Sequence, residues 1–166
     1  MRGFCYSEKT FMKKFEHGFV LGKFMPLHAG HIHLLKTAKD ASKKLTILLY
    51  SQSSDPIPGA ARLEWIKETF PKAQVLHHQK PLPRDEAATL FWDIWRDSIL
   101  SYCSGETFDA IFSSEDYGER LARELGATHV LVDQKRIKFP VSGTDIRNDP
   151  KKFWEFIPEI VRPYYQ

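Results

Sequence analysis

The chain has only two cysteines, no long apolar run and a small net charge, and each shortage excludes a class of protein. Cys5 and Cys103 are far apart in sequence, so they predict neither a disulfide framework nor a metal-binding set. The longest apolar run, residues 45–50, is far too short to span a membrane, and the N-terminus lacks the apolar core of a signal peptide. We therefore expect a soluble cytoplasmic protein with no membrane partner.

The net charge of the 166 residues is only +3. Proteins that bind nucleic acid usually cluster Lys and Arg, and no recognition motif accompanies the two densest basic stretches, residues 36–44 and 134–138. The first stretch is expected to form the solvated face of a helix, and the second to offer a phosphate contact. The sequence therefore predicts no nucleic-acid partner.

Apolar strand patterns alternate with helical patterns along most of the chain. Residues 1–16 show no clear period and are predicted to form an N-terminal arm, and residues 17–166 to form one domain that ends in helices. Strands are expected at residues 17–21, 45–50, 73–78, 108–112 and 129–132, and helices at 29–42, 59–70, 85–103 and 115–125. This alternation predicts an α/β fold with a doubly wound, Rossmann-like parallel sheet.

Residues 22–31, Gly-Lys-Phe-Met-Pro-Leu-His-Ala-Gly-His, directly follow the first predicted strand. Ligands of open parallel sheets bind at the carboxyl ends of strands, and a helix start favours anions. His28 and His31 are three residues apart, so both imidazoles can face one phosphate group. Gly30 leaves room beside the helix start. We interpret the segment as a phosphate-binding turn.

Two simpler interpretations of the histidines remain open at this point. One is a cap or surface position, which is usual for a single histidine near a helix start. The other is a metal site, but no third or fourth ligand is evident, because His77 and His78 are adjacent on a strand and point to opposite faces. We predict no protein-held metal.

A second segment, residues 141–147, reads Val-Ser-Gly-Thr-Asp-Ile-Arg. Ser142 or Thr144 is a good N-cap for a short helix, and a plain cap is the simpler interpretation. Together with the Gly143 amide and the Arg147 guanidinium, however, the hydroxyls form an anion-binding set.

These two segments resemble the H-x-G-H nucleotidyltransferase superfamily, whose fold is a doubly wound dinucleotide-binding type. Residues 57–66, 112–118, 140–147 and 162–165 narrow the resemblance to the adenylyltransferase domain of NadR-type nicotinamide mononucleotide adenylyltransferases. The similarity covers nearly all of residues 17–165. A P-loop for the ribosylnicotinamide kinase of that family is missing, so we expect a stand-alone adenylyltransferase or an excised domain.

The resemblance implies transfer of AMP from ATP to nicotinamide mononucleotide, giving NAD and pyrophosphate, with Mg²⁺ carried by ATP. The attacking phosphate is already anionic at neutral pH, so catalysis comes from positioning and charge stabilisation. Catalysis is assigned to His28, His31 and Arg147. The residues assigned to ATP are Gly22, Lys23, Phe24, His28, Gly30, His31, Ser142, Gly143, Thr144 and Arg147.

The nicotinamide ring of the acceptor is flat and cationic, which suits aromatic stacking. Trp92 is favoured for this contact, whereas Trp95 is expected mainly in the core. The residues assigned to the mononucleotide are Phe24, Arg62, Trp92, Ser113, Ser114, Asp133 and Arg136. Glu115 is expected only to begin a solvated helix. Another acceptor, such as nicotinate mononucleotide or phosphopantetheine, a non-catalytic nucleotide sensor, and assembly into a homo-oligomer all remain open.

Overall fold

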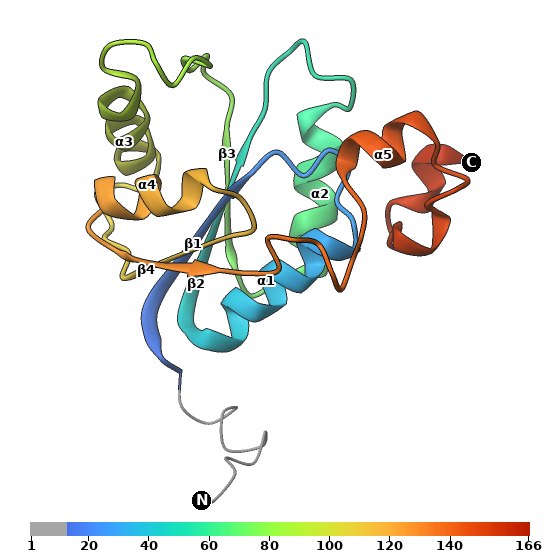
Figure 1. Ribbon diagram of the computed structural model, residues 1–166, viewed down its shortest axis with the longest axis horizontal. Coiled ribbons are helices and arrows are strands. Elements are labelled where there is room, and N and C mark those ends of the chain that lie inside the picture. The colour runs from blue at the N-terminus through green and yellow to red at the C-terminus, as the bar shows by residue number, and fades with distance from the viewer. Residues whose placement is uncertain (1–12) are drawn as a thin grey trace, which may run out of the picture.

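A computed structural model describes residues 13–166, with a five-stranded parallel sheet at its centre (Figure 1). The strands are β1 (Phe15–Gly22), β2 (Ser42–Tyr50), β3 (Gln74–His78), β4 (Ala110–Ser113) and β5 (Thr128–Leu131). Their order is β3-β2-β1-β4-β5, and each neighbouring pair is parallel. The predicted parallel sheet is confirmed, and the order reverses direction between β1 and β4.

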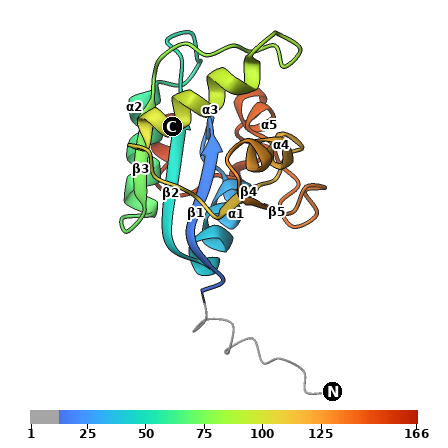
Figure 2. The same ribbon diagram turned by 90° about the vertical axis from the view of Figure 1, so that its left-hand side faces the viewer.

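The helices connect successive strands and cover both faces of the sheet (Figures 1 and 2). They are α1 (Ala29–Ala41), α2 (Gly59–Thr69), α3 (Phe91–Tyr102), α4 (Tyr117–Glu124) and α5 (Gly143–Asn148), followed by short 3₁₀ turns at Trp154–Phe156 and Arg162–Tyr165. Every crossover therefore has the strand–helix–strand form that a parallel sheet requires.

Two hydrophobic cores lie on opposite faces of the sheet, because successive strand residues point to opposite sides. In β1, Val20 packs into the core that includes residues of α1, α2 and α5, whereas Phe19 packs into the core that includes residues of α3 and α4. Ile47 and Leu48 of β2 divide between the two cores in the same way. This burial on both faces explains why residues 45–50 are apolar except for Thr46, whose buried hydroxyl is hydrogen-bonded to Gln74 at 2.8 Å.

Most predicted boundaries lie within three residues of the observed ones, and two of the differences are informative. The helix predicted to begin at residue 85 begins at Phe91, because Leu90 has a φ of 65°, which is incompatible with helix. The predicted arm, residues 1–16, falls mostly outside the described residues, and its last two residues, Phe15 and Glu16, belong to β1.

Cys103 is buried as a free thiol, and burial raises its pKa to about 11, so it stays protonated at neutral pH. Cys5 lies outside the described residues. Within residues 13–166, no helix is long and apolar enough to cross a membrane.

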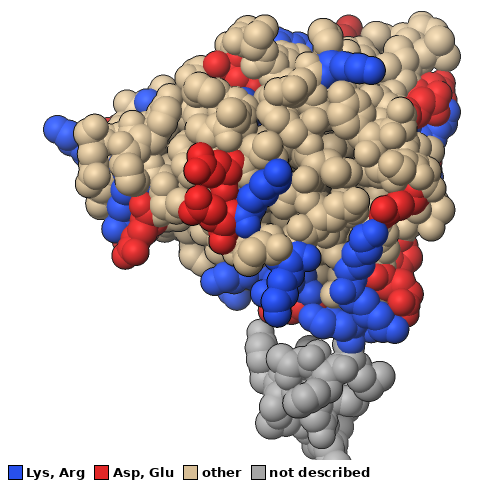
Figure 3. Space-filling model, turned by 180° about the vertical axis from the view of Figure 1, so that it is seen from behind, with Lys and Arg blue, Asp and Glu red and all other residues tan. Residues whose placement is uncertain are grey.

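Charged side chains of both signs mingle on the face shown in Figure 3, and Lys and Arg gather at the lower end of the described surface in this view. Two ion pairs at the amino end of the sheet join Lys43 to Glu16 at 2.6 Å and Lys44 to Glu106 at 2.9 Å. Acidic partners therefore offset part of the basic charge at this end of the sheet.

Candidate active site

A cleft of about 700 Å³ opens at the carboxyl end of the sheet, where the strand order reverses between β1 and β4. Its walls come from the loop after β1, the start of α1, the loops after β3, β4 and β5, and the start of α5. This is the position at which open α/β sheets bind their ligands. Segments far apart in the sequence therefore meet in one hollow.

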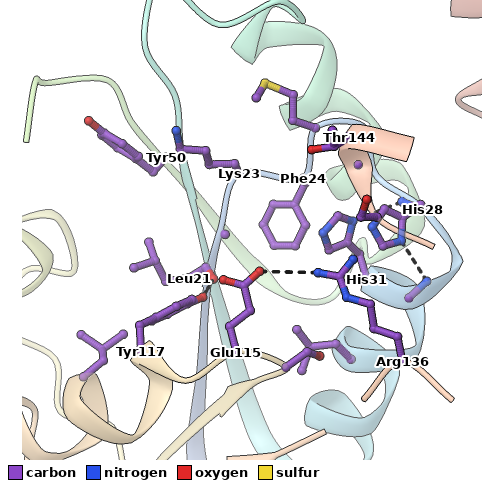
Figure 4. A pocket seen from close by; sticks show the side chains of 18 of the residues that line it. Leu21, Lys23, Phe24, His28, His31, Tyr50, Glu115, Tyr117, Arg136 and Thr144 are labelled. Carbon is purple, nitrogen blue, oxygen red and sulfur yellow. Dashed lines mark hydrogen bonds and ion pairs between the residues drawn. The ribbon is translucent and has the colours of Figure 1, made fainter. Parts of the chain in front are cut away.

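His28 and His31 begin α1 and are fixed by the backbone around them (Figure 4). The Nδ1 atom of His28 accepts a hydrogen bond from the Gly30 amide at 3.0 Å, and the His28 amide donates to Nδ1 of His31 at 3.3 Å. The two rings stack with centroids 3.7 Å apart. Because each Nδ1 accepts a backbone proton, each neutral imidazole carries its own proton on Nε2, as a donor.

Both imidazoles are held in the neutral form. Burial, with the nearby Arg136 charge, lowers the pKa of His28 to about 4. Burial likewise lowers the pKa of His31 well below its ordinary value, and His28 and Arg136 lower it further. The pair therefore presents neutral N–H donors at physiological pH.

Acidification is expected to weaken the fold through His28, which is only 5% exposed. Its pKa is about 4 in the folded protein against 6.5 when unperturbed, so the unfolded chain binds the extra proton first. The stabilisation is complete above pH 6.5 and is lost as the pH falls towards 4, a change of about 2–3 kcal/mol. Urea unfolding at pH 7.5 and pH 4.5 measures this difference.

The matched variant for this measurement is His28→Asn, because asparagine is also a good N-cap but does not titrate. The variant should show a smaller loss of stability between the two pH values than the wild type. An equal loss in both proteins would assign the acid sensitivity to other groups.

Gly30 is required by the His28 ring. A Cβ atom at position 30 would lie 2.9 Å from Cε1 of that ring, which is closer than side chains pack. Phe24 precedes the pair with a φ of 49°, and its ring meets the His31 ring edge-on at 5.1 Å. The turn and the helix start therefore form one packed unit.

The second segment contacts the first directly. Arg147 of α5 donates through Nη1 to the Met25 carbonyl, and its Nη2 lies 3.3 Å from Oγ1 of Thr144. A Cβ atom at Gly143 would lie 2.5 Å from the same Met25 oxygen, so only glycine permits this approach. The two phosphate-binding segments predicted from the sequence thus share one wall of the cleft.

Ser142 is the N-cap of α5, as its simpler interpretation predicted. Its hydroxyl accepts from the Asp145 amide at 3.1 Å, and the Asp145 carboxylate accepts from the Ser142 amide at 2.9 Å. Ser142 also lines the cleft. The capped start of α5 therefore forms part of the cleft wall.

The loop after β5 brings a cation to the same cleft (Figure 4). Asp133 organises this loop by accepting the amides of Ile137 and Lys138 at 2.9 and 3.1 Å. Arg136 donates to the Val141 carbonyl at 3.0 Å, and its Nη2 lies 3.9 Å from the Glu115 carboxylate.

The far end of the cleft is aromatic. Trp92 and Trp95 of α3 both line it, together with Tyr50 at the end of β2. Trp95 meets the Tyr50 ring edge-on at 5.1 Å and donates to the Pro83 carbonyl at 3.0 Å. The Arg120 guanidinium lies 5.5 Å from the Trp92 ring centre. Trp95, expected mainly in the core, thus packs against the core and also lines the cleft.

Most of the residues singled out from the sequence line this cleft. They are Gly22, Lys23, Phe24, His28, Gly30, His31, Trp92, Ser114, Asp133, Arg136, Ser142, Gly143, Thr144 and Arg147.

Arg62 and Ser113 are the two exceptions, and both lie away from the cleft wall. Arg62 is fully buried and paired with Asp55 at 2.7 Å. Ser113 is 1% exposed, with its hydroxyl 2.8 Å from Nε2 of His129. Each of these side chains is hydrogen-bonded inside the protein, and neither lines the cleft.

Several cleft residues were not singled out from the sequence, among them Tyr50, Glu115 and Tyr117. Tyr117 donates its hydroxyl to the Leu21 carbonyl at 2.7 Å and so ties α4 to the end of β1. The sequence could have indicated such residues only by their position after a predicted strand, because side chains at the carboxyl ends of neighbouring parallel strands meet at one edge of the sheet. That rule identifies Tyr50. Glu115, expected only to begin a solvated helix, instead lies before the start of α4 at Tyr117 and lines the cleft.

Among the described residues, no three His, Cys, Asp or Glu side chains come together as a metal site. The guanidinium groups of Arg136 and Arg147 line the cleft together with the two histidines, and such N–H donors suit an anion.

No protein-family model matches the chain. The NadR protein of Escherichia coli K12, a trifunctional NAD biosynthesis and regulator protein, is 32% identical over 166 aligned residues, covering 89% of this chain. The chain spans 40% of that relative's length. A nicotinamide-nucleotide adenylyltransferase of Methanolobus tindarius is 29% identical over 136 residues, covering 78% of this chain and 73% of the relative.

Solved structures show the same fold. A NadR protein in complex with NAD and AMP-PNP superposes with a TM-score of 0.69 at 19% identity, covering 92% of this chain and 47% of that one. A bifunctional NMN adenylyltransferase/ADP ribose pyrophosphatase from Francisella tularensis, complexed with AMP and a manganese ion, has a TM-score of 0.51 at 21% identity, covering 90% of this chain and 51% of that one. The chain is thus homologous to NadR and to nicotinamide-nucleotide adenylyltransferase, and it has their α/β nucleotidyltransferase fold.

Proposed function

We propose that this chain is a nicotinamide-nucleotide adenylyltransferase, which transfers AMP from ATP to nicotinamide mononucleotide and releases pyrophosphate. The observation that carries the proposal is the contact between the two phosphate-binding segments at Met25. It places the neutral His28–His31 pair and the Arg147 fork on one wall of a cleft whose other end is aromatic. A relative named for this activity, at 29% identity, and NadR, which is named for NAD biosynthesis, at 32% identity, support the same assignment.

In this reaction a phosphate oxygen of the mononucleotide attacks the α-phosphorus of ATP. A new P–O bond forms, the bond from the α-phosphorus to the bridging oxygen breaks, and the electron pair leaves with pyrophosphate. No base is needed, because the attacking oxygen is already anionic. Catalysis then depends on donors that hold the reactants in line and stabilise charge on the leaving oxygen.

We assign His31 to the α-phosphate and the leaving oxygen, with His28 beside it on the triphosphate. Arg147, Thr144 and the amide of Gly143 hold the β- and γ-phosphates. ATP enters as its magnesium complex, and the ion shields the triphosphate oxygens from one another. The aromatic end formed by Trp92 and Trp95 receives the cationic ring of the acceptor.

The test is an assay of the purified chain with ATP, Mg²⁺ and nicotinamide mononucleotide. NAD is followed by enzymatic reduction to NADH, and pyrophosphate is measured separately. Equal amounts of NAD and pyrophosphate are expected. Parallel reactions with nicotinate mononucleotide, phosphopantetheine or CTP define the specificity.

Pyrophosphate release with another acceptor, together with no NAD from nicotinamide mononucleotide, would show that the other acceptor is the substrate. Nucleotide binding without turnover on any acceptor would support the sensor interpretation and refute the enzymatic one.

A further inference from the structure

Arg62 is a buried cation that the proposed reaction does not use. It lies in the first turn of α2, with no exposed surface. Its Nη2 atom donates to the Asp55 carboxylate at 2.7 Å, and its Nη1 atom donates to the Lys23 carbonyl at 2.8 Å. One guanidinium therefore joins the loop after β2 to the loop after β1.

The Asp55 end of this bridge is itself fixed. Its carboxylate is 6% exposed and also accepts the Gln52 amide at 2.9 Å. Burial opposes ionisation of Asp55, but the Gln52 amide and the Arg62 guanidinium outweigh it and hold the pKa of the carboxyl below its ordinary value. The bridge is therefore a charged pair at neutral pH.

A buried ion pair is a costly way to stabilise a fold, because both charges lose their hydration. An apolar pair of similar volume is often as stabilising. The guanidinium fork, however, fixes the direction of the two groups that it binds, which an apolar pair does not. This pair therefore suits a role in positioning better than a role in stability.

The carbonyl held by Arg62 lies at the start of the phosphate-binding turn. Lys23 is followed by Phe24, which has a positive φ of 49°. This backbone conformation is unfavourable for residues other than glycine, so contacts with the surrounding structure must stabilise it. The Phe24 ring packs edge-on against His31. A continuous series of contacts thus runs from Asp55 through Arg62, Lys23 and Phe24 to His31.

We propose that Arg62 is a positioning residue, which fixes the turn after β1 so that His31 meets the α-phosphate in the correct orientation. The proposal rests on the function proposed above, and it replaces the expectation that Arg62 contacts the mononucleotide. Arg62 acts through Lys23 and Phe24, and it touches no substrate.

The test compares the wild type with the double variant Arg62→Met/Asp55→Leu, which removes both charges and leaves no unpaired ion in the interior. Arg162→Met is the matched control, because Arg162 also donates to a backbone carbonyl, that of Ile157 at 2.9 Å, but this carbonyl is not part of the turn after β1. Arg62→Lys retains the charge but not the fork.

Steady-state kinetics should show kcat lowered about 10- to 100-fold in the double variant, because small displacements of a catalytic group have effects of this size. The KM for nicotinamide mononucleotide should change less than twofold. Arg62→Lys should fall between the wild type and the double variant, and Arg162→Met should match the wild type.

Two kinetic outcomes would overturn the proposal. A large rise in the KM for the mononucleotide with kcat unchanged would make Arg62 a substrate contact. Unchanged kinetics with only a lower melting temperature would make the pair purely structural.

A readout that does not require turnover separates this proposal from the proposed function. Nitrogen-15 NMR of the imidazoles and calorimetric titration with ATP apply even if the wild type forms no NAD. The His31 resonances should move, and ATP should bind more weakly, in the double variant but not in Arg162→Met. Unchanged His31 resonances would refute the positioning role, whereas inactivity of the wild type alone would refute only the proposed function.

Discussion

Replacing His31 by glutamine is expected to lower kcat for NAD formation by about 10²- to 10³-fold, the usual cost of losing one donor to a developing oxyanion. The substitution is chosen for its effect on the helix start. His31 accepts the His28 amide at 3.3 Å, and glutamine at the same helical position can accept that amide as well. The capping interaction is thus retained, while the Nε2–H donor of an imidazole fixed by stacking is replaced by the carboxamide of a flexible side chain.

His33→Gln is the control, since His33 lies on the same helix and packs beside Phe139 at 5.4 Å without lining the cleft. It should keep kcat within about threefold of the wild type, as neutral surface substitutions do. The KM for ATP separates two roles: a change in KM alone would limit His31 to ground-state binding. A His31→Gln enzyme as active as the control would remove His31 from the mechanism.

The parallel sheet was predictable from the chain because its central strands are apolar on both faces. Residues 45–50 are all buried, which is why Thr46 is the one polar residue among them. The position of the cleft followed from the same topology, since a turn after the first strand must lie at the carboxyl end of the sheet. His28, His31, Ser142 and Arg147 were identified because each lies in a short segment whose neighbours suit phosphate.

The start of α3 was not predictable from local pattern. Residues 85–90 contain helix-forming side chains, but Leu90 adopts a left-handed conformation that ends any continuous helix there. This loop instead supplies Arg84 and Glu86 to the cleft wall. Backbone conformations of this kind are set by tertiary packing, which outweighs the modest differences in helix propensity.

The role of Arg62 was also hidden, for a different reason. An arginine early in a helix is normally exposed, and only its spatial neighbours show that it is buried. Its partners, Asp55 and the Lys23 carbonyl, are 7 and 39 residues away in sequence. Sequence pattern identifies residue types that suit a chemistry, but it does not show which of them are already paired inside the protein.

Replacing Arg147 by alanine is expected to lower kcat/KM for ATP by about 10²- to 10³-fold, through two losses at once. The first is a charge-assisted contact to the triphosphate. The second is the hydrogen bond to the Met25 carbonyl, which holds α5 against the phosphate-binding turn. Both losses should raise the KM for ATP, and the second should also lower kcat by loosening the turn that precedes His28.

Arg147→Lys separates the two losses, because lysine keeps the charge but cannot bind Met25 and a phosphate with one planar fork. It should recover part of the ATP affinity and little of kcat. Lys152→Ala is the control for charge alone, since Lys152 follows α5 closely but does not line the cleft. A fully active Arg147→Lys enzyme would show that charge is sufficient and that the contact with Met25 does not matter for catalysis. An Arg147→Ala enzyme as active as the Lys152→Ala control would refute the role of α5 in holding the triphosphate.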